Sequence, residues 1–300
     1  MELIELGLDT VVEGRWRKNK YKVKKQIGSG AIASVYLVED IKTKKYYALK
    51  ISKDSLSINR EYQLLRKFSS ADMIVDVYEM DDYYIKGTNY YFVLLEYIEG
   101  SNLKDYSRKN KLKKNTIIGI ILILIKGIEV FHREEYIVAD LKPENIMIDK
   151  KNRQIKIIDL GGVVKKEEGI KEFTPAYDRA SWKCGERRAE ASYDLFTLMM
   201  ILTKLLLKED ISPKKQSIND IILKLKSNSI GKDLEEYIIE GLLGNQKSLE
   251  YFTRKLKKLY ISNSLYHKQQ KQVKINKRIN FFFLFSIVFF IFTIIFIFLI

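Results

Sequence analysis

The chain has 300 residues, of which 46% are hydrophobic, so it is long enough to bury a core of ordinary domain size. One cysteine in the sequence excludes an internal disulfide framework, and Cys184 with His132 and His267 offers too few ligands for an ordinary zinc site. The formal net charge of +15 would suit nucleic acid or an anionic membrane surface, so its position along the chain has to distinguish these partners.

The amino-terminal third of the chain has the composition of a β-sheet. Residues 1–20 contain no apolar run of signal-peptide length, and we treat them as an N-terminal extension. Residues 21–97 are rich in β-branched and aromatic residues, which predicts strands, and one helix is expected among them at 57–68. The predicted strands are YKVKKQIG, SVYLVED, KKYYALKIS, MIVDVYEM and NYYFVLLEY.

A glycine-rich hairpin lies between the first two predicted strands, in the string IGSGAIASVY. Glycine lets the backbone approach an anion, so the main-chain N–H groups of such a loop can cover phosphates. The residues of this loop are Ile27, Gly28, Ser29, Gly30 and Ala31. An ordinary hairpin turn would also use glycine here. A dinucleotide-binding fold is disfavoured, because a strand follows the glycines where that fold needs a helix.

A lysine and a glutamate form a candidate ion pair in the same region. Lys50 ends the strand string YYALK and points a cation inward among apolar neighbours, which is costly unless the ammonium is paired. Eleven residues later, Glu61 lies on the predicted helix and would neutralise and orient Lys50. The alternative for Glu61 is a solvated charge on the helix surface.

Helical segments dominate the rest of the chain. The long periodic ones lie at 115–132, 193–207 and 233–243. A sheet followed by helices predicts an α+β fold of two unlike lobes with a cleft between them.

The string YIVADLKPENIMID, followed shortly by QIKIIDLGG, carries the most specific chemistry. Asn145 and Asp159 offer the hard oxygen ligands that Mg²⁺ prefers. Asp140 can then orient a hydroxyl nucleophile, and Lys142 can stabilise charge that moves onto a phosphoryl group. A loop of solvated charges is the alternative reading of this spacing.

With these motifs, the chain resembles the eukaryotic-type Ser/Thr protein kinases of bacteria, from about Tyr21 to Leu259. The resemblance implies a bilobal protein-kinase-like fold, ATP and Mg²⁺ as cofactors, and protein substrates that accept phosphate on Ser or Thr. We expect a kinase domain at 21–260, with an N-lobe at 21–97 and a C-lobe at 98–260.

The resemblance also implies a role for each matching residue. Lys50 would contact the α- and β-phosphates and pair with Glu61, Asp140 would be the catalytic base, and Asn145 and Asp159 would hold Mg²⁺. Lys142 resembles the Ser/Thr branch of the family, and Asp194 matches the helix acid that braces the catalytic loop. The positions implied around adenine are Val35, Ala48 and Leu95 as walls, with the Glu96 carbonyl and the Ile98 N–H at its edge.

The chain departs from the family pattern at several positions. Ala33 replaces the last glycine of the loop, and Leu160 replaces the phenylalanine of the DFG string. The family's HRD string reads VAD, so Ala139 replaces the arginine that commonly receives an activation-loop phosphate. Ser181 replaces a glutamate that normally pairs with an arginine late in the C-lobe, and 231–253 contains no arginine. We therefore expect a somewhat less stable C-lobe.

The activation segment lacks an acceptor for the phosphate that the missing arginine would receive. Residues 161–173 contain no Ser, Thr or Tyr, so the phosphate acceptor and its arginine are absent together. This predicts an activation segment that needs no phosphorylation. Thr174, directly after it, is expected to matter only for substrate docking.

The carboxyl-terminal end predicts a membrane anchor. Nine Lys or Arg and no acid lie between Arg254 and Arg278, and 261–280 is therefore treated as a basic linker. The 20 residues at 281–300 carry no charge, and as a helix they would be about 30 Å long, the thickness of a bilayer core. The basic flank predicts a cytoplasmic kinase domain and contacts with anionic lipid. A buried core helix is the alternative, no nucleic-acid partner is predicted, and the oligomeric state stays open.

Three other functions remain open at this point. A tethered pseudokinase would bind nucleotide or partners without transfer, and the altered HRD and APE strings favour it. A small-molecule kinase of similar fold would usually lack the Lys-Pro-Glu-Asn string after the base. An anchored structural subunit of a membrane assembly would depend on 281–300 more than on the cleft.

Overall fold

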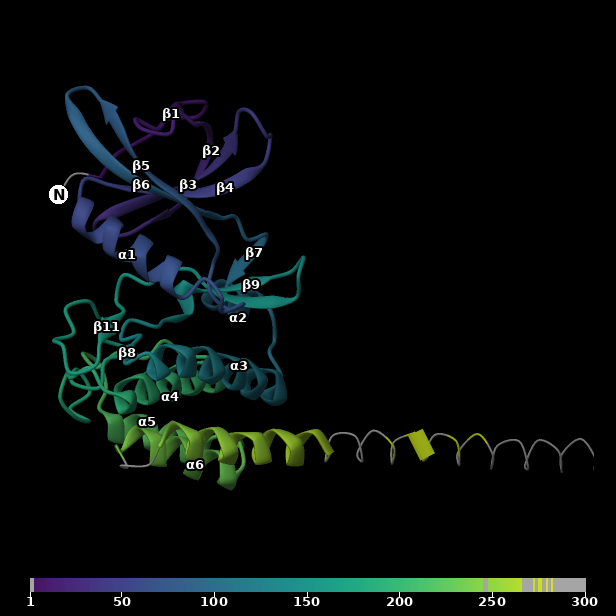
Figure 1. The fold of residues 1–300 in the computed structure, drawn as a ribbon. Helices are drawn as coiled ribbons and strands as arrows, with labels where there is room; N and C mark the ends of the chain where they lie inside the picture. The colour runs from purple at the N-terminus through teal and green to yellow at the C-terminus, as the bar shows by residue number, and fades with distance from the viewer. Residues whose placement is uncertain are drawn as a thin grey trace, which may run out of the picture.

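The computed structural model describes residues 3–244 and 248–265, together with positions 272, 275, 276, 279 and 282. The chain forms a small β-rich lobe stacked on a larger helical lobe, with helix α1 between them (Figure 1). The predicted bilobal α+β arrangement is confirmed. The predicted membrane segment at 281–300 lies outside the described residues except for position 282, and it stays a prediction.

The N-lobe contains a six-stranded antiparallel sheet in the order β1-β2-β3-β4-β6-β5. Alternating burial along the strands gives it one face toward α1 and one face toward the amino-terminal segment. Its strands are β1 at Val11–Glu13, β2 at Lys20–Ser29, β3 at Ala33–Asp40, β4 at Tyr46–Ser52, β5 at Val77–Ile85 and β6 at Thr88–Glu96.

The fourth predicted strand differs from the structure. It was expected at 73–80, whereas β5 begins at Val77 and runs on to Ile85. The apolar residues before it form a loop between the lobes, in which the Val75 N–H donates to the Ile157 carbonyl at 3.1 Å. Ile74 and Val75 are therefore apolar because they are buried between the lobes, and periodicity alone cannot separate that from a strand.

The amino-terminal extension packs as part of the N-lobe. Val12 on β1 is fully buried and Ile4 is 8% exposed, and both join the apolar cluster on the outer face of the sheet. The Tyr36 hydroxyl donates to the Ile4 carbonyl at 2.8 Å. Structurally, the lobe thus starts well before the expected boundary at Tyr21.

Helix α1 at Ser55–Lys67 starts two residues before the expected boundary because Asp54 caps it. The Asp54 Oδ1 accepts from the Ser57 N–H at 3.1 Å. The buried face of α1 carries Ile58, Leu64 and Leu65 together with one charged residue, Glu61.

The C-lobe is built on two apolar helices. α3 at Lys114–Arg133 and α4 at Ala191–Leu207 supply most of its core. In the described part of the chain, α3 alone is long and apolar enough to cross a bilayer, yet half of its most apolar stretch is buried inside the lobe. The smaller elements are β7 at Gly100–Asn102, α2 at Leu103–Lys109, β8 at Tyr136–Ile137, η1 at Pro143–Asn145, β9 at Ile146–Asp149, β10 at Gln154–Ile157, β11 at Val164–Lys165, α5 at Ile218–Ser227 and α6 at Lys232–Leu242.

A last helix over 249–265 packs against α3. The Asn115 amide Nδ2 donates to Ser264 Oγ at 2.6 Å, and Thr253 Oγ1 donates to Glu129 Oε1 at 3.2 Å. These contacts lie near opposite ends of α3, so the two helices run side by side.

A buried ion pair stabilises the C-lobe where the family glutamate is missing. Asp178, three residues before Ser181, is fully buried and accepts from Arg187 Nη2 at 2.6 Å and from the Tyr193 hydroxyl at 2.8 Å. Ser181 Oγ donates to the same carboxylate at 2.6 Å. The acid and its arginine are thus both supplied by one short segment, which a search for an arginine at 231–253 misses.

Candidate active site

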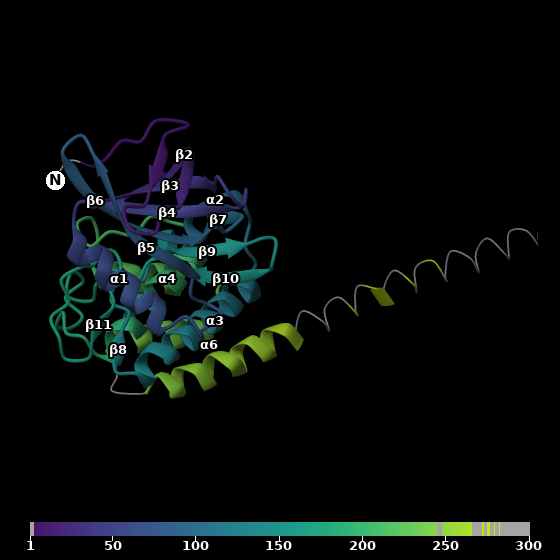
Figure 2. The ribbon, with the colours of Figure 1, turned by 45° about the horizontal axis from the view of Figure 1, so that its top comes forward.

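A buried ion-pair network connects the sheet, α1 and the segment after β10. The Lys50 Nζ on β4 lies 2.6 Å from Glu61 Oε2 and 3.3 Å from Asp159 Oδ1. The Glu61 side chain is only 3% exposed, so it is not a solvated helix charge. Figure 2 shows helix α1 beneath the sheet that contains β4.

The charges of this network shift one another. Burial alone would lower the pKa of Lys50, but the carboxylates of Glu61 and Asp159 outweigh it and raise that pKa. Burial raises the pKa of Glu61 to about 7, although Lys50 opposes the shift. Burial also acts to raise the pKa of Asp159, but Lys50 and the Gly161 N–H outweigh it and lower that pKa. Lys50 and Asp159 therefore stay charged at neutral pH, whereas Glu61 titrates close to it.

The catalytic-loop string forms a three-residue hydrogen-bond cluster. Asp140 Oδ2 accepts from Lys142 Nζ at 2.5 Å, and Asp140 Oδ1 accepts from Thr174 Oγ1 at 2.7 Å. Lys142 Nζ also lies 3.3 Å from Thr174 Oγ1. Thr174 thus contacts both Asp140 and Lys142. The sequence indicated only a docking role for Thr174 and did not predict these contacts. No local pattern in the sequence joins residues 34 positions apart.

Asp194 holds the catalytic loop from α4. Its side chain is 1% exposed, and its Oδ1 and Oδ2 accept from the Ala139 and Val138 N–H groups, both at 2.9 Å. Oδ2 also lies 2.8 Å from His132 Nε2. Ala139 has a φ of 60°, which is unfavourable for a residue with a Cβ. The paired N–H groups fix this strained backbone, and with it the direction of Asp140.

The start of the activation segment packs tightly against Asp140 and α1. A Cβ built on Gly162 would lie 2.7 Å from the Asp140 Cβ, so the approach requires glycine. The Arg60 Nη2 on α1 donates to the Val163 carbonyl, a contact that the sequence motifs did not indicate. The helix that carries Glu61 is therefore also bonded to the activation segment.

The side chains proposed for Mg²⁺ keep unused oxygens. Asp159 Oδ1 accepts from the Gly161 N–H at 2.9 Å, and Asn145 Nδ2 donates to the Asp140 carbonyl at 3.4 Å. No described residue donates to Asp159 Oδ2 or to Asn145 Oδ1. Within the same part of the chain, no three His, Cys, Asp or Glu side chains cluster as a metal site. One carboxylate and one amide oxygen fit Mg²⁺, which takes few protein ligands and completes its shell with phosphate and water.

The expected adenine walls lie together on neighbouring strands. Ala48 pairs with Leu95 across β4 and β6, and they are 9% and 5% exposed. Val35 on β3 pairs with Lys50 on one side and with Gly28 on the other. These pairings place the apolar positions next to Lys50 in the sheet. The two expected adenine-edge positions follow: Glu96 is the last residue of β6, and Ile98 is buried just after it.

The glycine-rich loop forms the β2–β3 hairpin. Gly30 N–H donates to the Ala33 carbonyl at 2.9 Å, and both Gly28 and Gly30 have ordinary negative φ values. Glycine is thus not needed there for the backbone conformation. A Cβ at Gly30 would lie 3.7 Å from the Ala33 carbonyl oxygen, which is an ordinary contact, so packing does not require glycine there either. Ile27, Ser29 and Ala31 belong to the same hairpin.

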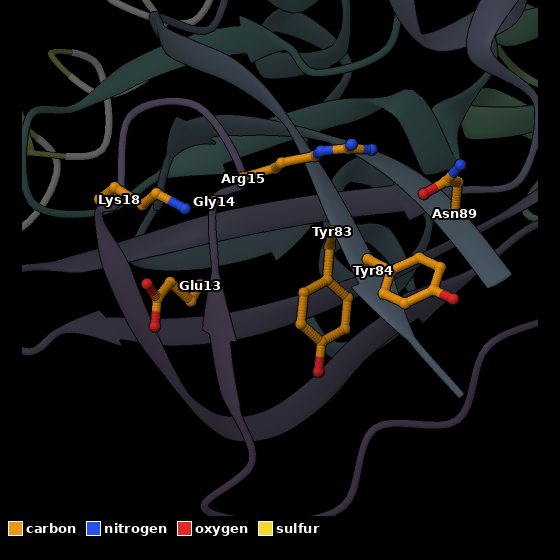
Figure 3. Close-up of a pocket in the computed structure, with 7 residues that line it drawn as sticks. All are labelled: Glu13, Gly14, Arg15, Lys18, Tyr83, Tyr84 and Asn89. Atoms are coloured by element: carbon orange, nitrogen blue, oxygen red, sulfur yellow. The ribbon is translucent and has the colours of Figure 1, made fainter. Parts of the chain in front are cut away.

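A cavity of about 460 Å³ lies elsewhere, between the β1 turn and the β5–β6 hairpin (Figure 3). It is lined by Gly14, Arg15, Lys18, Tyr83, Asn89 and neighbouring side chains, and none of them belongs to the cleft described above. We do not assign the nucleotide to it, because none of the phosphate- or metal-binding candidates faces it.

Comparison with known proteins agrees with this geometry. The protein kinase domain family matches residues 21–272. The serine/threonine-protein kinase YabT of Bacillus subtilis is 34% identical over 247 residues, which are 80% of this chain and 72% of the relative. The serine/threonine-protein kinase PrkC of the same organism is 30% identical over 158 residues, 49% of this chain and 23% of the relative. A probable KIN1 homologue of Enterocytozoon bieneusi is 31% identical over 176 residues, 56% of this chain and 27% of the relative.

The match thus spans most of YabT but about a quarter of PrkC and of the KIN1 homologue, so it identifies the kinase domain and not the other parts of those longer proteins. The family model covers far more than half of the chain, including every residue of the cleft described above. The chain therefore belongs to the protein kinase family, and it is a protein serine/threonine kinase.

Proposed function

We propose that this kinase transfers the terminal phosphoryl group of ATP to Ser or Thr hydroxyls of proteins at the cytoplasmic face of a membrane, without phosphorylation of its activation segment. The observation that carries the transfer reaction is the assembled cleft. Lys50 is already paired with Glu61 and Asp159, and Asp140 is already bonded to Lys142 and Thr174. Because these contacts join one strand, one helix and three loop segments of both lobes, they do not arise from one local turn.

Each side chain has a distinct task in this proposal. Asp140 accepts the proton from the substrate hydroxyl as that oxygen attacks the phosphoryl group. Lys142 stabilises negative charge on the transferred group, and Thr174 fixes the orientation of the Asp140 carboxylate. Lys50, held by Glu61, positions the α- and β-phosphates.

Mg²⁺, when bound, would neutralise charge on the phosphates. Asn145 Oδ1 and Asp159 Oδ2 are the atoms that would hold it, because both are hard oxygens without a donor among the described residues. Val35, Ala48 and Leu95 would enclose adenine, with the Glu96 carbonyl and the Ile98 N–H at its edge.

The test is phosphoryl transfer by the full chain in detergent, with labelled ATP, Mg²⁺ and a generic basic protein. We expect Asp140→Asn to lower the rate by roughly 10²- to 10⁴-fold, the range for a general base. ATP binding by that variant should persist. Equal incorporation by both proteins would refute the role of Asp140, and incorporation by neither would favour the nucleotide-binding pseudokinase.

The proposal of phosphorylation-independent activation is supported by an apolar cluster around Ala139. Ile137, Val164, Ile170 and Tyr193 bury their side chains with Ala139, at the position where the family arginine is missing. The Lys166 N–H donates to the Glu135 carbonyl at 2.8 Å, and the Glu167 N–H donates to the Ala189 carbonyl at 2.9 Å. Apolar burial and these main-chain bonds can order the segment without a phosphate.

Phosphatase treatment tests this part of the proposal. We expect the treated full chain to keep its transfer rate, with no phosphate detected by mass spectrometry at Thr174, Tyr177 or Ser181, the hydroxyl residues that follow 161–173. A rate that falls on treatment and returns after autophosphorylation of one of these three residues would overturn it.

Membrane attachment rests on the sequence alone. The basic linker at 261–280 and the apolar run at 281–300 motivate it. We expect the full chain to sediment with membranes and a variant that lacks 281–300 to become soluble with its transfer rate retained. A soluble full chain would exclude the anchor and leave the kinase assignment intact.

A further inference from the structure

A buried lysine outside the catalytic set connects the two ends of the proposed nucleotide site. Lys156 lies on β10, three residues before Asp159, and its side chain is 8% exposed. A buried ammonium is unfavourable unless it is paired and hydrogen-bonded. The groups that pair with Lys156 therefore indicate its role.

Those partners belong to the strand that leads into the adenine edge and to the loop before β5. Lys156 Nζ lies 3.2 Å from Glu96 Oε2, and it donates to the Ile74 carbonyl at 3.2 Å. Glu96 is the last residue of β6, and its N–H donates to the Asp76 carbonyl at 2.9 Å. The ammonium thus fixes the Glu96 side chain while the loop fixes the Glu96 main chain.

The main chain around Lys156 continues to the metal-binding side. The Ile157 N–H donates to the Met73 carbonyl at 2.7 Å, and the Ile158 N–H donates to the Asn145 carbonyl at 3.0 Å. Asp159 follows directly. Strand β10, which leads into Asp159 and the bond to Asn145, is thus bonded to the same loop as Glu96, with the buried ammonium at the junction.

We infer that Lys156 is a positioning residue that sets the distance between the adenine edge at Glu96 and the metal-binding pair Asn145 and Asp159. ATP can span only a limited range of distances between its base and its phosphates, so both ends of the site must be held at a separation within that range. A ligand that occupies only the adenine end does not depend on that separation. This inference rests on the nucleotide site of the proposed function.

Two probes separate this role from a merely structural one. Binding of Mg·ATP and of adenosine to the full chain in detergent would be measured by titration calorimetry. We expect Lys156→Met to weaken Mg·ATP binding at least fivefold and adenosine binding less than twofold, and to raise the KM for ATP more than it lowers kcat. Lys151→Met is the matched control, because Lys151 is exposed in the turn before β10, and it should change neither affinity.

The variant Lys156→Met leaves the Glu96 carboxylate without its partner and could impair folding. The double variant Glu96→Gln with Lys156→Met removes both charges and keeps the test available. Because the two residues act through one contact, we expect the double variant to lose Mg·ATP affinity to the same extent as Lys156→Met alone.

The outcomes are distinguishable. Equal loss of both ligands, or no loss of either, in Lys156→Met or in the double variant would overturn the inference alone. Failure of the wild-type chain to bind Mg·ATP would overturn the proposed nucleotide site and this inference with it.

Discussion

The phosphate-binding region and the activation segment are ordered by opposite kinds of contact. Lys50, Glu61 and Asp159 align through buried ion pairs, whereas Val164 and Ile170 align through an apolar cluster beside Ala139. Ionic contacts are directional and leave a charge available for a ligand, while apolar contacts are non-directional and insensitive to pH. The difference indicates that charge is concentrated where ATP is expected, and that the segment usually held by a phosphate is held here by burial.

The largest expected effect on activity comes from removing Lys50, the shared partner in the phosphate-binding region. Lys50→Met removes the shared partner of Glu61 and Asp159, so we expect kcat to fall roughly 10²- to 10³-fold, as for the loss of one preorganised electrostatic contact. Transfer assays with labelled ATP would measure it, and Lys42→Met, at an exposed position between β3 and β4, would be the control. A change below tenfold would show that the network is structural and not catalytic.

Breaking the apolar side should have the next largest effect. Val164→Asp buries a carboxylate without a partner, which costs at least about 2 kcal/mol and corresponds to roughly a 30-fold loss of the ordered segment. Hydrogen exchange of 161–173 should rise in parallel with the loss of activity. Val164→Ile, which keeps the site apolar, should retain most of the activity, and equal loss in both variants would contradict the apolar account.

Thr174 lies where the two regions meet, so its removal sharpens the comparison. Thr174→Val deletes the hydrogen bond to Asp140 and is expected to lower kcat about tenfold, since such a bond to a charged group contributes roughly 1.5 kcal/mol or more. Thr174→Ser keeps the hydroxyl and should restore most of the rate. If the two variants changed only the KM for the protein substrate, Thr174 would serve docking alone.

The pH dependence should be smallest and should affect the ionic side only. Because the pKa of Glu61 is raised to about 7, the carboxylate takes up a proton as the pH falls through 7 and Lys50 loses its partner. ATP affinity should then fall by at most about tenfold per pH unit. The folded state binds this proton more tightly than the unfolded chain. The contribution of Glu61 to the free energy of unfolding therefore increases as the pH falls from about 7 toward the ordinary carboxyl pKa of 4.5.

Calorimetric titration with ATP and thermal melts between pH 5.5 and 8 would follow both quantities. Glu61→Gln should bind ATP weakly at every pH in that range. Loss of affinity with the same pH profile in that variant would assign the proton to another group.

Much of the fold followed from patterns that physics constrains locally. The alternation along β3, β4 and β6 and the helical period of α3 and α4 predicted these elements closely, because one face of each must be buried. The loop before β5 was predicted as a strand, since residues buried between two lobes are as apolar as strand residues. Lys50, Glu61, Asp140 and Asp159 were predicted as site residues from their charge and spacing together with the family resemblance, and the structure places Lys50 against Glu61 and Asp159.

Local sequence patterns could not predict contacts between segments that are far apart in the sequence. The contacts of Thr174 with Asp140 and of Arg60 with Val163 depend on how the chain returns on itself, which residue spacing does not encode. The expected lower stability of the C-lobe was argued from the missing arginine at 231–253, and it stays a prediction. The structure pairs the buried Asp178 with Arg187, nine residues later in the same loop.

The amino-terminal segment has a practical consequence for work on the isolated domain. A recombinant fragment that begins at Tyr21 would remove Ile4 and Val12 from the sheet and open the apolar side of Val23, Tyr36 and Val38 to water. Uncovered apolar patches of this kind promote self-association. Fragments that start at or before residue 3 should remain monodisperse, and affinity tags at that end would need a spacer so that Ile4 can still reach the Tyr36 hydroxyl.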